Sequence, residues 1–309
     1  MEIVINNEKI DYTLENETNL NEIIRGVECW LKGSHLIITS IMMEERELTD
    51  EPEESWINTP LSDVAKLTIT AKLLKEIQLS SMETVIEFLG LFLKSLDSRD
   101  RAQLEEVLRG CPDMLQSLRT LFKPGPLLPV NPEITELGTL LAGSDAETVL
   151  SWPEGIREKA LLLLQRLRAS VQDLMEELSN PLGALQKAAV ELKVTTSDIE
   201  SVSVLLQTGQ DKKAMDSIIR FADLSQKTIR ALSNMEEASL IGLDKLRIDD
   251  KTAKDFFKDF NRVLQELVEA FDGNDIVLIG DILEYEISPR LAPYLRFIDE
   301  IQKGNTTDA

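Results

Sequence analysis

Histidine and cysteine are scarce in this sequence: His35, Cys29 and Cys111 are the only examples in 309 residues. One histidine cannot complete a catalytic zinc site, and the two cysteines lie far apart, in no metal-binding spacing. We therefore expect no cofactor, and reduced thiols in a cytoplasmic protein. A nucleophilic pair of Cys29 and His35 is an alternative. Packing roles are favoured for Cys29, on an apolar helix, and for Cys111, before Pro112 at a helix end.

Long apolar runs and familiar catalytic motifs are also missing. No stretch of about 18 apolar residues occurs, so no transmembrane helix is predicted. The first residues, MEIVINNEKIDYTLENE, lack a basic segment followed by an apolar one, so no signal peptide is predicted. P-loop, GxGxxG, GxSxG and HExxH patterns are absent, which excludes the best-known nucleotide-binding, hydrolase and zinc-protease signatures.

Positive charge is in short supply, with 33 basic against 55 acidic residues and a net charge of −22. Such a protein repels phosphate backbones and anionic lipid surfaces, so neither nucleic acid nor membrane is expected as a partner. Two interpretations of the acidity stay open. It either keeps the protein soluble or favours a partner protein with a basic surface.

The first quarter of the chain carries strand patterns around one helix. Polar and apolar residues alternate at Glu2–Asn6 and again at Ile10, Tyr12 and Leu14, which predicts a β-hairpin with a turn at 6–9. Asn19 is placed to cap a helix that ends at Lys32-Gly33. Two β-branched stretches, HLIITSIMM at 35–43 and KLTITA at 66–71, predict further strands.

This order of strand, strand, helix, strand, strand resembles the β-grasp, or ubiquitin-like, fold. The resemblance covers residues 1–72 and rests on element order. β-Grasp sulfur and protein carriers need a free C-terminal Gly-Gly tail, whereas the last strand here continues into KLLK at 72–75. The resemblance therefore implies a sheet face or edge for binding, and no carrier chemistry.

Helical periodicity dominates from residue 73 onward, so the fold class is α+β and mainly α. A small β-grasp domain would precede antiparallel helical hairpins and a four-helix bundle. The expected organisation is a β-grasp-like domain at 1–72, a helical hairpin region at 73–123, a Pro-rich linker at 124–131, a helical region at 132–194, a four-helix bundle at 195–303 and a flexible tail at 304–309.

Capping residues and prolines predict where the helices begin and end. Ser81 would start a helix over 82–96, and Trp152-Pro153 would start one over about 154–179. Thr196 or Ser197 would cap a helix that runs to Gln207. A final pair of helices would break at Pro289.

Three stretches align without a gap: Phe92–Leu108, Ser203–Ile219 and Leu267–Leu283. Each ends one helix, makes a polar turn and starts another helix at an aspartate, Asp100, Asp211 or Asp275, that we expect to be a cap. Gly209 and Gly273 would adopt positive φ to end the first helix. The apolar positions that follow are Leu104, Val107 and Leu108; Met215, Ile218 and Ile219; and Ile279, Ile282 and Leu283.

These stretches predict αα-hairpins, through either internal duplication or the generic pattern of such hairpins. Two segments that overlap the second and third stretches, LLQTGQDKKAM and GDILEYEISPRL, are similar in sequence to uncharacterised bacterial helical-bundle domains. That resemblance implies no known activity.

An acidic run at 44–54 is the first candidate binding site. It ends beside an aromatic residue, and its candidate partner-binding residues are Glu51, Glu53, Glu54 and Trp56. The run is either a solvated loop or a docking site for a basic partner.

The second candidate site comprises Asp281, Glu284 and Tyr285, where the third aligned stretch differs from the others. Two carboxylates on one helical face could hold a metal, or could be a solvated face. A calcium loop starting at Asp272 is excluded, because Ile276 and Leu283 stand where oxygen ligands are required.

The sequence thus favours a non-catalytic cytoplasmic adaptor or scaffold that binds a protein, possibly basic, or forms a homo-oligomer. Two alternatives remain: a carboxylate-based, metal-dependent enzyme, and an acidic chaperone for a secreted or assembling partner.

Overall fold

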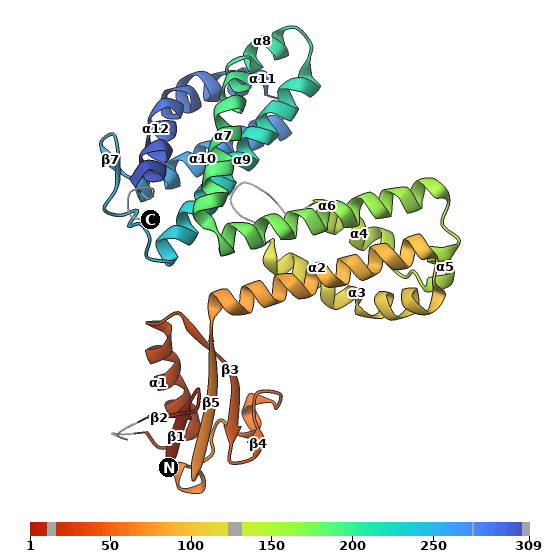
Figure 1. Cartoon of the computed structure of the whole chain (residues 1–309). Coiled ribbons are helices and arrows are strands. Elements are labelled where there is room, and N and C mark those ends of the chain that lie inside the picture. Colours follow the sequence, from red (N-terminus) through yellow and green to blue (C-terminus); the bar gives the residue numbers. More distant parts are fainter. Residues whose placement is uncertain (11–16, 123–131, 274, 305–309) are drawn as a thin grey trace. The chain divides into compact units, whose positions relative to one another are not determined.

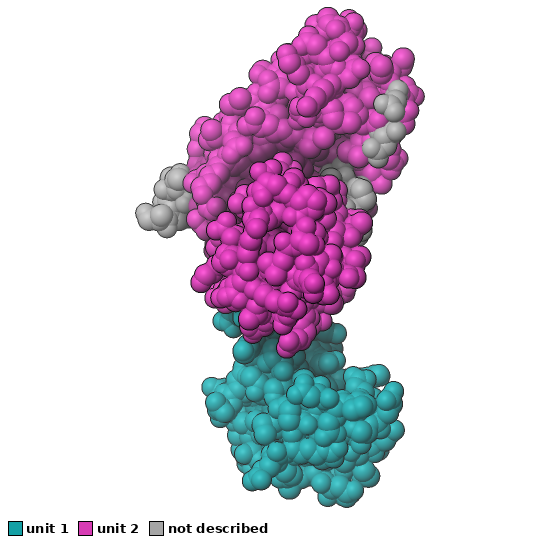
Figure 2. All heavy atoms as spheres, turned by 90° about the vertical axis from the view of Figure 1, so that its right-hand side faces the viewer, with its two compact units in different colours: residues 1–81 teal, residues 82–309 magenta. Residues whose placement is uncertain are grey.

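A computed structural model describes residues 1–10, 17–122, 132–273 and 275–304. The chain divides into two compact units, Met1–Ser81 and Met82–Ala309, which are coloured separately in Figure 2. Strands dominate the first unit and helices the second, so the protein is α+β and mainly α, as predicted (Figure 1). The predicted linker at 124–131, Tyr12, Leu14 and the tail beyond residue 304 lie outside the described residues.

The first unit opens with the predicted hairpin of β1 (Glu2–Ile5) and β2 (Glu8–Ile10). Its turn is only two residues long: Asn6 and Asn7 have φ of 50° and 68°. Asparagine tolerates this left-handed backbone, which matches the twist of a two-residue hairpin. The Asn6 side chain also donates to the Ala71 carbonyl at 2.9 Å and accepts from the Ala71 N–H at 2.8 Å, which extends the pairing beyond β1.

A five-stranded mixed sheet follows, in the order β2-β1-β5-β3-β4. The remaining strands are β3 (Leu36–Met43), β4 (Arg46–Glu47) and β5 (Lys66–Leu73). β1 pairs parallel to β5, whereas β3 pairs antiparallel to β5. The only helix between β2 and β3 in the described chain is α1 (Leu20–Lys32), and Asn19 caps it as predicted by accepting from the Glu22 N–H at 3.2 Å.

One face of this sheet and one stripe of α1 form the core of the first unit. On β1 and β5, buried side chains alternate with more exposed ones, so one face of the sheet contributes to the core. On α1, buried residues recur every three or four positions, which places them on one side of the helix. The members of this core include Ile3, Ile5, Leu20, Ile23, Ile24, Val27, Leu31, Leu67, Ile69 and Ala71. Burial of each large aliphatic side chain contributes about 1.5–3 kcal/mol.

The helix after β5 begins earlier than predicted. α2 spans Leu74–Ser98, so the expected start at Ser81 is wrong. The Ser81 hydroxyl donates to the Ile77 carbonyl at 2.8 Å, a bond made inside a helix and not at a cap. No breaker separates β5 from good helix formers such as Leu74 and Lys75, which explains the direct transition.

α3 (Arg101–Leu121) runs through Pro112, so the helix end predicted there is also wrong. α2 and α3 are neighbours, because Gly110 lies against Phe88. A Cβ at Gly110 would lie 2.7 Å from a carbon of that ring, so a side chain would not fit without a shift. The helices that follow are α4 (Pro132–Leu141), α5 (Ala146–Leu150), which was not predicted, and α6 (Glu154–Ser179), which was predicted.

Four long helices make up the C-terminal bundle: α7 (Pro181–Glu200), α9 (Asp211–Glu237), α10 (Ala253–Asp272) and α12 (Ser288–Gly304). Their core includes a cluster of contacting rings from Phe221, Phe256, Phe257, Phe260, Tyr294 and Phe297. A short hairpin, β6 (Arg247–Ile248) and β7 (Lys251–Thr252), precedes α10. This hairpin was not predicted.

The helix start predicted at Thr196 or Ser197 is wrong, because both residues lie inside α7. Their hydroxyls donate to the carbonyls of Leu192 and Val194, each at 2.9 Å. The expected domain boundary between residues 194 and 195 therefore falls within one helix. Only Ser201 separates α7 from the short α8 (Val202–Gln207).

The predicted break at Pro289 is wrong as well. α11 (Ile276–Asp281) continues through a π-helical segment, η3 (Ile282–Ile287), into α12. Proline has no N–H and clashes with the carbonyl four residues earlier in a regular α-helix. The wider π turn absorbs this misfit, so the chain continues helically past Pro289.

The aligned stretches differ in detail. Asp100 and Asp275 cap their helices as predicted, but Gln210 occupies the cap position before Asp211, without a side-chain cap bond. Gly209 has the expected positive φ of 72°, whereas Gly273 is right-handed with φ of −76°. In the second stretch the buried positions are Ala214 and Ile218, while Ile219 is exposed. That copy is therefore shifted by one residue.

Candidate functional site

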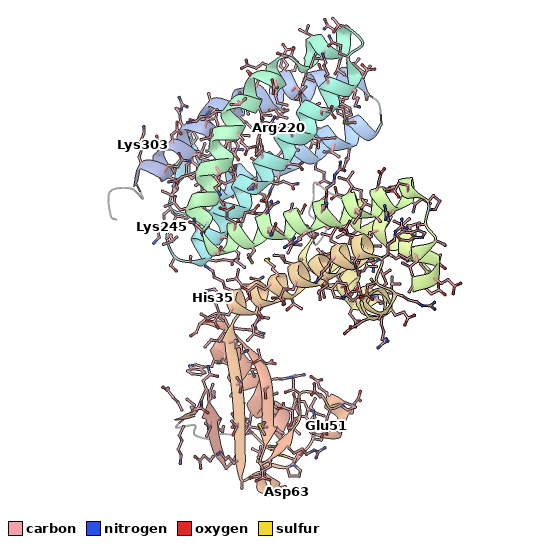
Figure 3. The ribbon with its side chains drawn as sticks, turned by 45° about the vertical axis from the view of Figure 1, so that its right-hand side comes forward. His35, Glu51, Asp63, Arg220, Lys245 and Lys303 are labelled. Carbon is pink, nitrogen blue, oxygen red and sulfur yellow. The ribbon has the colours of Figure 1, made fainter. Side chains whose placement is uncertain are left out.

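The acidic loop of the first unit is ordered by its own side chains. Arg46 pairs with Glu51 through two guanidinium nitrogens, one of them at 2.7 Å, and this partner holds the pKa of Glu51 below its usual range. Glu53 and Glu54 are exposed on a 3-10 turn, η1 (Glu53–Ser55). In Figure 3, Glu51 and Asp63 lie away from the end of this unit that bears His35.

Trp56 is buried, with 6% of its surface exposed, and belongs to the core of the first unit. Its indole N–H makes no hydrogen bond within the described part of the chain. The loop thus presents carboxylates to solvent, while the Trp56 indole packs in the core. A partner that docked on this loop would be held by electrostatic attraction alone.

The second candidate site lies at the π-helical segment of the second unit. Asp281, Glu284 and Tyr285 are all exposed, and 64% of the Tyr285 surface is accessible. The Glu284 carboxylate, its hydrogen bond with the phenol and the more distant Asp281 raise the pKa of Tyr285 above its ordinary value. The phenol therefore remains neutral at physiological pH.

The π turn shapes this surface, because it places Ile282, Leu283 and Ile287 in the core while its polar residues face solvent. The Ser288 hydroxyl donates to the Leu283 carbonyl, five residues earlier, at 2.8 Å. Arg290 bonds both the backbone carbonyl and the carboxylate of Glu286. Of the acidic residues on this turn, Glu286 is therefore neutralised, whereas Asp281 and Glu284 form no ion pair with any described residue.

Three consecutive aliphatic residues are exposed at the start of α11: Ile276, Val277 and Leu278. Val277 is 75% exposed, whereas the next residue but one, Ile279, is 1% exposed. Asp275 fixes this orientation by accepting from the Leu278 N–H at 3.0 Å. The exposure of these residues was not predicted, although a run of four apolar residues on an amphipathic helix cannot place every side chain in the core.

α8 lies beside α11 at the same end of the bundle (Figure 1). It contributes Val204, which is 60% exposed. We call Val204, Ile276, Val277 and Leu278 together the α8/α11 surface. Val277, Asp281 and Tyr285 follow one another at intervals of four residues, so the apolar surface continues into the second candidate site.

Acidic residues outnumber basic ones in the segments that carry and flank α8 and α11 along the chain. The exposed charged residues of the neighbouring segments 197–216 and 275–284 are Asp198, Glu200, Asp211, Asp216, Asp275, Asp281 and Glu284, against Lys212 and Lys213. None of these side chains forms an ion pair with another described residue. The local electrostatic field is therefore negative.

The remaining chemistry-bearing residues are dispersed. Cys29 is exposed, so the packing role predicted for it is wrong, whereas Cys111 is buried as predicted. Burial raises the pKa of the Cys111 thiol to about 12. Within the described ranges, no three His, Cys, Asp or Glu side chains gather into a metal-binding group. No helix among the described residues is long and apolar enough to span a membrane.

Two segments of the chain match known protein families. Residues 1–72 match the TP0873 N-terminal domain, and residues 183–293 match a domain of unknown function, DUF8042. An uncharacterised protein of Treponema pallidum (strain Nichols) is 26% identical over 105 residues, or 34% of this chain. The chain covers 52% of that relative, about half its length. No solved structure matches. The α8/α11 surface and the π-helical segment both lie within the DUF8042 match.

Proposed function

We propose that this protein is a non-catalytic cytoplasmic adaptor or scaffold that binds another protein through the α8/α11 surface. The observation that carries the proposal is the run of exposed aliphatic side chains at Ile276–Leu278, with a further exposed valine, Val204, on the adjacent α8. Aliphatic side chains gathered in this way on a polar surface are typical of interaction sites. The cap at Asp275 and the buried Ile279 hold them in a fixed orientation.

The first unit would serve as a second module of the adaptor, with a β-grasp fold. Its strand order β2-β1-β5-β3-β4, with a parallel central pair of β1 and β5, supports that assignment. So does the position of α1 between β2 and β3 along the chain. The carboxylates of Glu51, Glu53 and Glu54 would then be a secondary, electrostatic contact.

A second copy of the chain is a weaker candidate for the partner. In a symmetric dimer the same surface faces itself, so exposed carboxylates such as Asp281 and Glu284 would lie against the same acidic surface of the other copy. Like charges brought together in this way oppose association. This acidic surface therefore favours a different protein.

Site-specific photo-crosslinking in the native cell tests the proposal. A photo-reactive residue at Val277 is compared with one at Val190, which is 67% exposed on α7 and serves as the matched control. We expect Val277 to crosslink to one defined protein, and Val190 not to do so. The crosslink should disappear when Leu278→Asp is added. Equal crosslinking from both positions, or none from Val277, would contradict the proposal.

A further inference from the structure

We propose that the partner bound at the α8/α11 surface presents a cationic amphipathic helix. This inference rests on the proposed function and adds the chemistry of the partner. Three observations carry it: the exposed aliphatic side chains, the unpaired carboxylates of Asp281 and Glu284, and the form of the neighbouring elements.

The aliphatic side chains supply an apolar contact along the axis of α11 and η3. Residues 276–287 form these two consecutive helical segments, of six residues each, the second with the shorter rise of a π-helix. A partner helix of about three turns would match that length. Anchors spaced three and four residues apart on such a helix would meet the exposed aliphatic side chains of α11.

The carboxylates select the sign of the partner's charge. Asp281 and Glu284 follow Val277 along the exposed face, and Asp211 and Asp216 lie on the neighbouring α9. An anionic helix would be repelled by the carboxylates of Asp281 and Glu284, whereas lysines or arginines on the partner would pair with them. The exposed Tyr285 ring adds a surface over which a cation is attracted.

A partner helix fits this surface better than a partner strand. Strand addition requires a free strand edge, and the described bundle contains only the two-residue strands β6 and β7. Both strands contact α10, and β6 also contacts α12. The elements that bear the exposed aliphatic side chains are both helical.

Fluorescence anisotropy with synthetic peptides tests the inference on the full chain. The probe is a labelled peptide with leucines on one helical face and lysines on the other. We expect it to bind the unaltered protein, and Val277→Asp to weaken binding by about tenfold or more, because the substitution disrupts the apolar contact. Val190→Asp adds the same charge elsewhere and should change the affinity by less than about twofold.

The carboxylates are tested by the double substitution Asp281→Asn with Glu284→Gln. It should weaken binding by several-fold and reduce the loss of affinity between about 50 and 200 mM salt. Two control peptides separate specific binding from attraction of any polycation to an acidic protein. A scrambled peptide with the same lysines, and a peptide with glutamates in place of the lysines, should both bind much more weakly.

The outcomes distinguish the inference from the proposed function. Equal binding of the scrambled peptide, or equal loss with Val277→Asp and Val190→Asp, would overturn the inference. Tight binding of the glutamate peptide would show that the partner's charge is wrongly assigned. If Val277 still crosslinks to one native protein that lacks a basic helix, the adaptor function stands and the cationic helix is refuted.

Discussion

Arg230 on α9 donates two hydrogen bonds to the Glu177 carboxylate on α6, from Nε at 2.7 Å and from Nη2 at 3.0 Å. Glu177 is 1% exposed, and its backbone carbonyl accepts from the Asn234 side chain at 3.0 Å. A buried carboxylate is tolerated only when it is paired in this way. The pair joins the last turn of α6 to the C-terminal bundle.

Removal of Arg230 should therefore destabilise the second unit. Arg230→Ala leaves the Glu177 carboxylate buried without a charged partner, which should lower the free energy of unfolding by about 3 kcal/mol. Arg220→Ala is the matched control, because Arg220 pairs with Glu191 at 3.7 Å between two exposed side chains. Arg220→Ala should lower the free energy of unfolding by less than about 1 kcal/mol. Urea denaturation compares the two variants, and equal effects would refute a structural role for Glu177.

The orientation of α11 can be tested with two neighbouring residues. Ile279→Ala removes a fully buried side chain and should lower the free energy of unfolding by about 2–4 kcal/mol. Val277→Ala alters an exposed side chain and should change it by less than about 0.5 kcal/mol. Thermal and urea unfolding measure both values. The reverse order would mean that α11 is rotated and that Val277 is not available to a partner.

The two cysteines should differ in reactivity. Cys29 is exposed, whereas Cys111 is buried with a raised pKa, so its thiolate is scarce at neutral pH. A colorimetric thiol reagent should modify one cysteine rapidly in the folded protein and both in urea. Cys29→Ser should abolish the fast reaction. Rapid modification of two thiols in the folded protein would contradict the burial of Cys111.

The buried phenol of Tyr294 should make the free energy of unfolding depend on pH at high pH. Burial in the bundle core raises the pKa of its phenol, whereas in the unfolded chain the phenol has a pKa of about 10. The folded state therefore keeps the proton at pH values where the unfolded chain has lost it. Below about pH 10 this group has no effect, and above it the free energy of unfolding falls by up to about 1.4 kcal/mol per pH unit.

Tyr294→Phe removes this contribution, so its stability should fall less steeply than that of the unaltered protein. Urea unfolding between about pH 9 and pH 11 measures the two slopes. Other groups titrate in the same range, but they are common to both proteins and cancel in the comparison. Identical slopes would show that the Tyr294 phenol is not buried in solution.

Local patterns in the sequence were sufficient for elements whose signals are short-range. Asn19, Asp100 and Asp275 were identified as caps, because a side-chain oxygen next to an apolar periodic run needs little tertiary context. The hairpin at Asn6-Asn7 and α6 were found for the same reason. The strand order required pairings between distant segments, such as β1 with β5, which no local pattern encodes.

Helix starts and ends that were predicted from proline, serine and threonine residues were wrong where tertiary packing overrides local preference. Pro112 and Pro289 both lie within continuous helices, the second accommodated by the π turn. Ser81, Thr196 and Ser197 donate to carbonyls within helices instead of capping them. Of the candidate site, the sequence indicated Asp281, Glu284 and Tyr285. It did not indicate the exposed aliphatic neighbours, because exposure depends on how α8 and α11 pack.

Hydrogen–deuterium exchange of the full chain, with and without the leucine–lysine peptide, locates the docking site. We expect slower backbone exchange in residues 202–207 and 276–287, with no change in residues 44–57. The same two segments should be protected by the native partner once crosslinking has identified it. Protection confined to the acidic loop, or absent from 276–287, would contradict the assignment of the α8/α11 surface as the docking site.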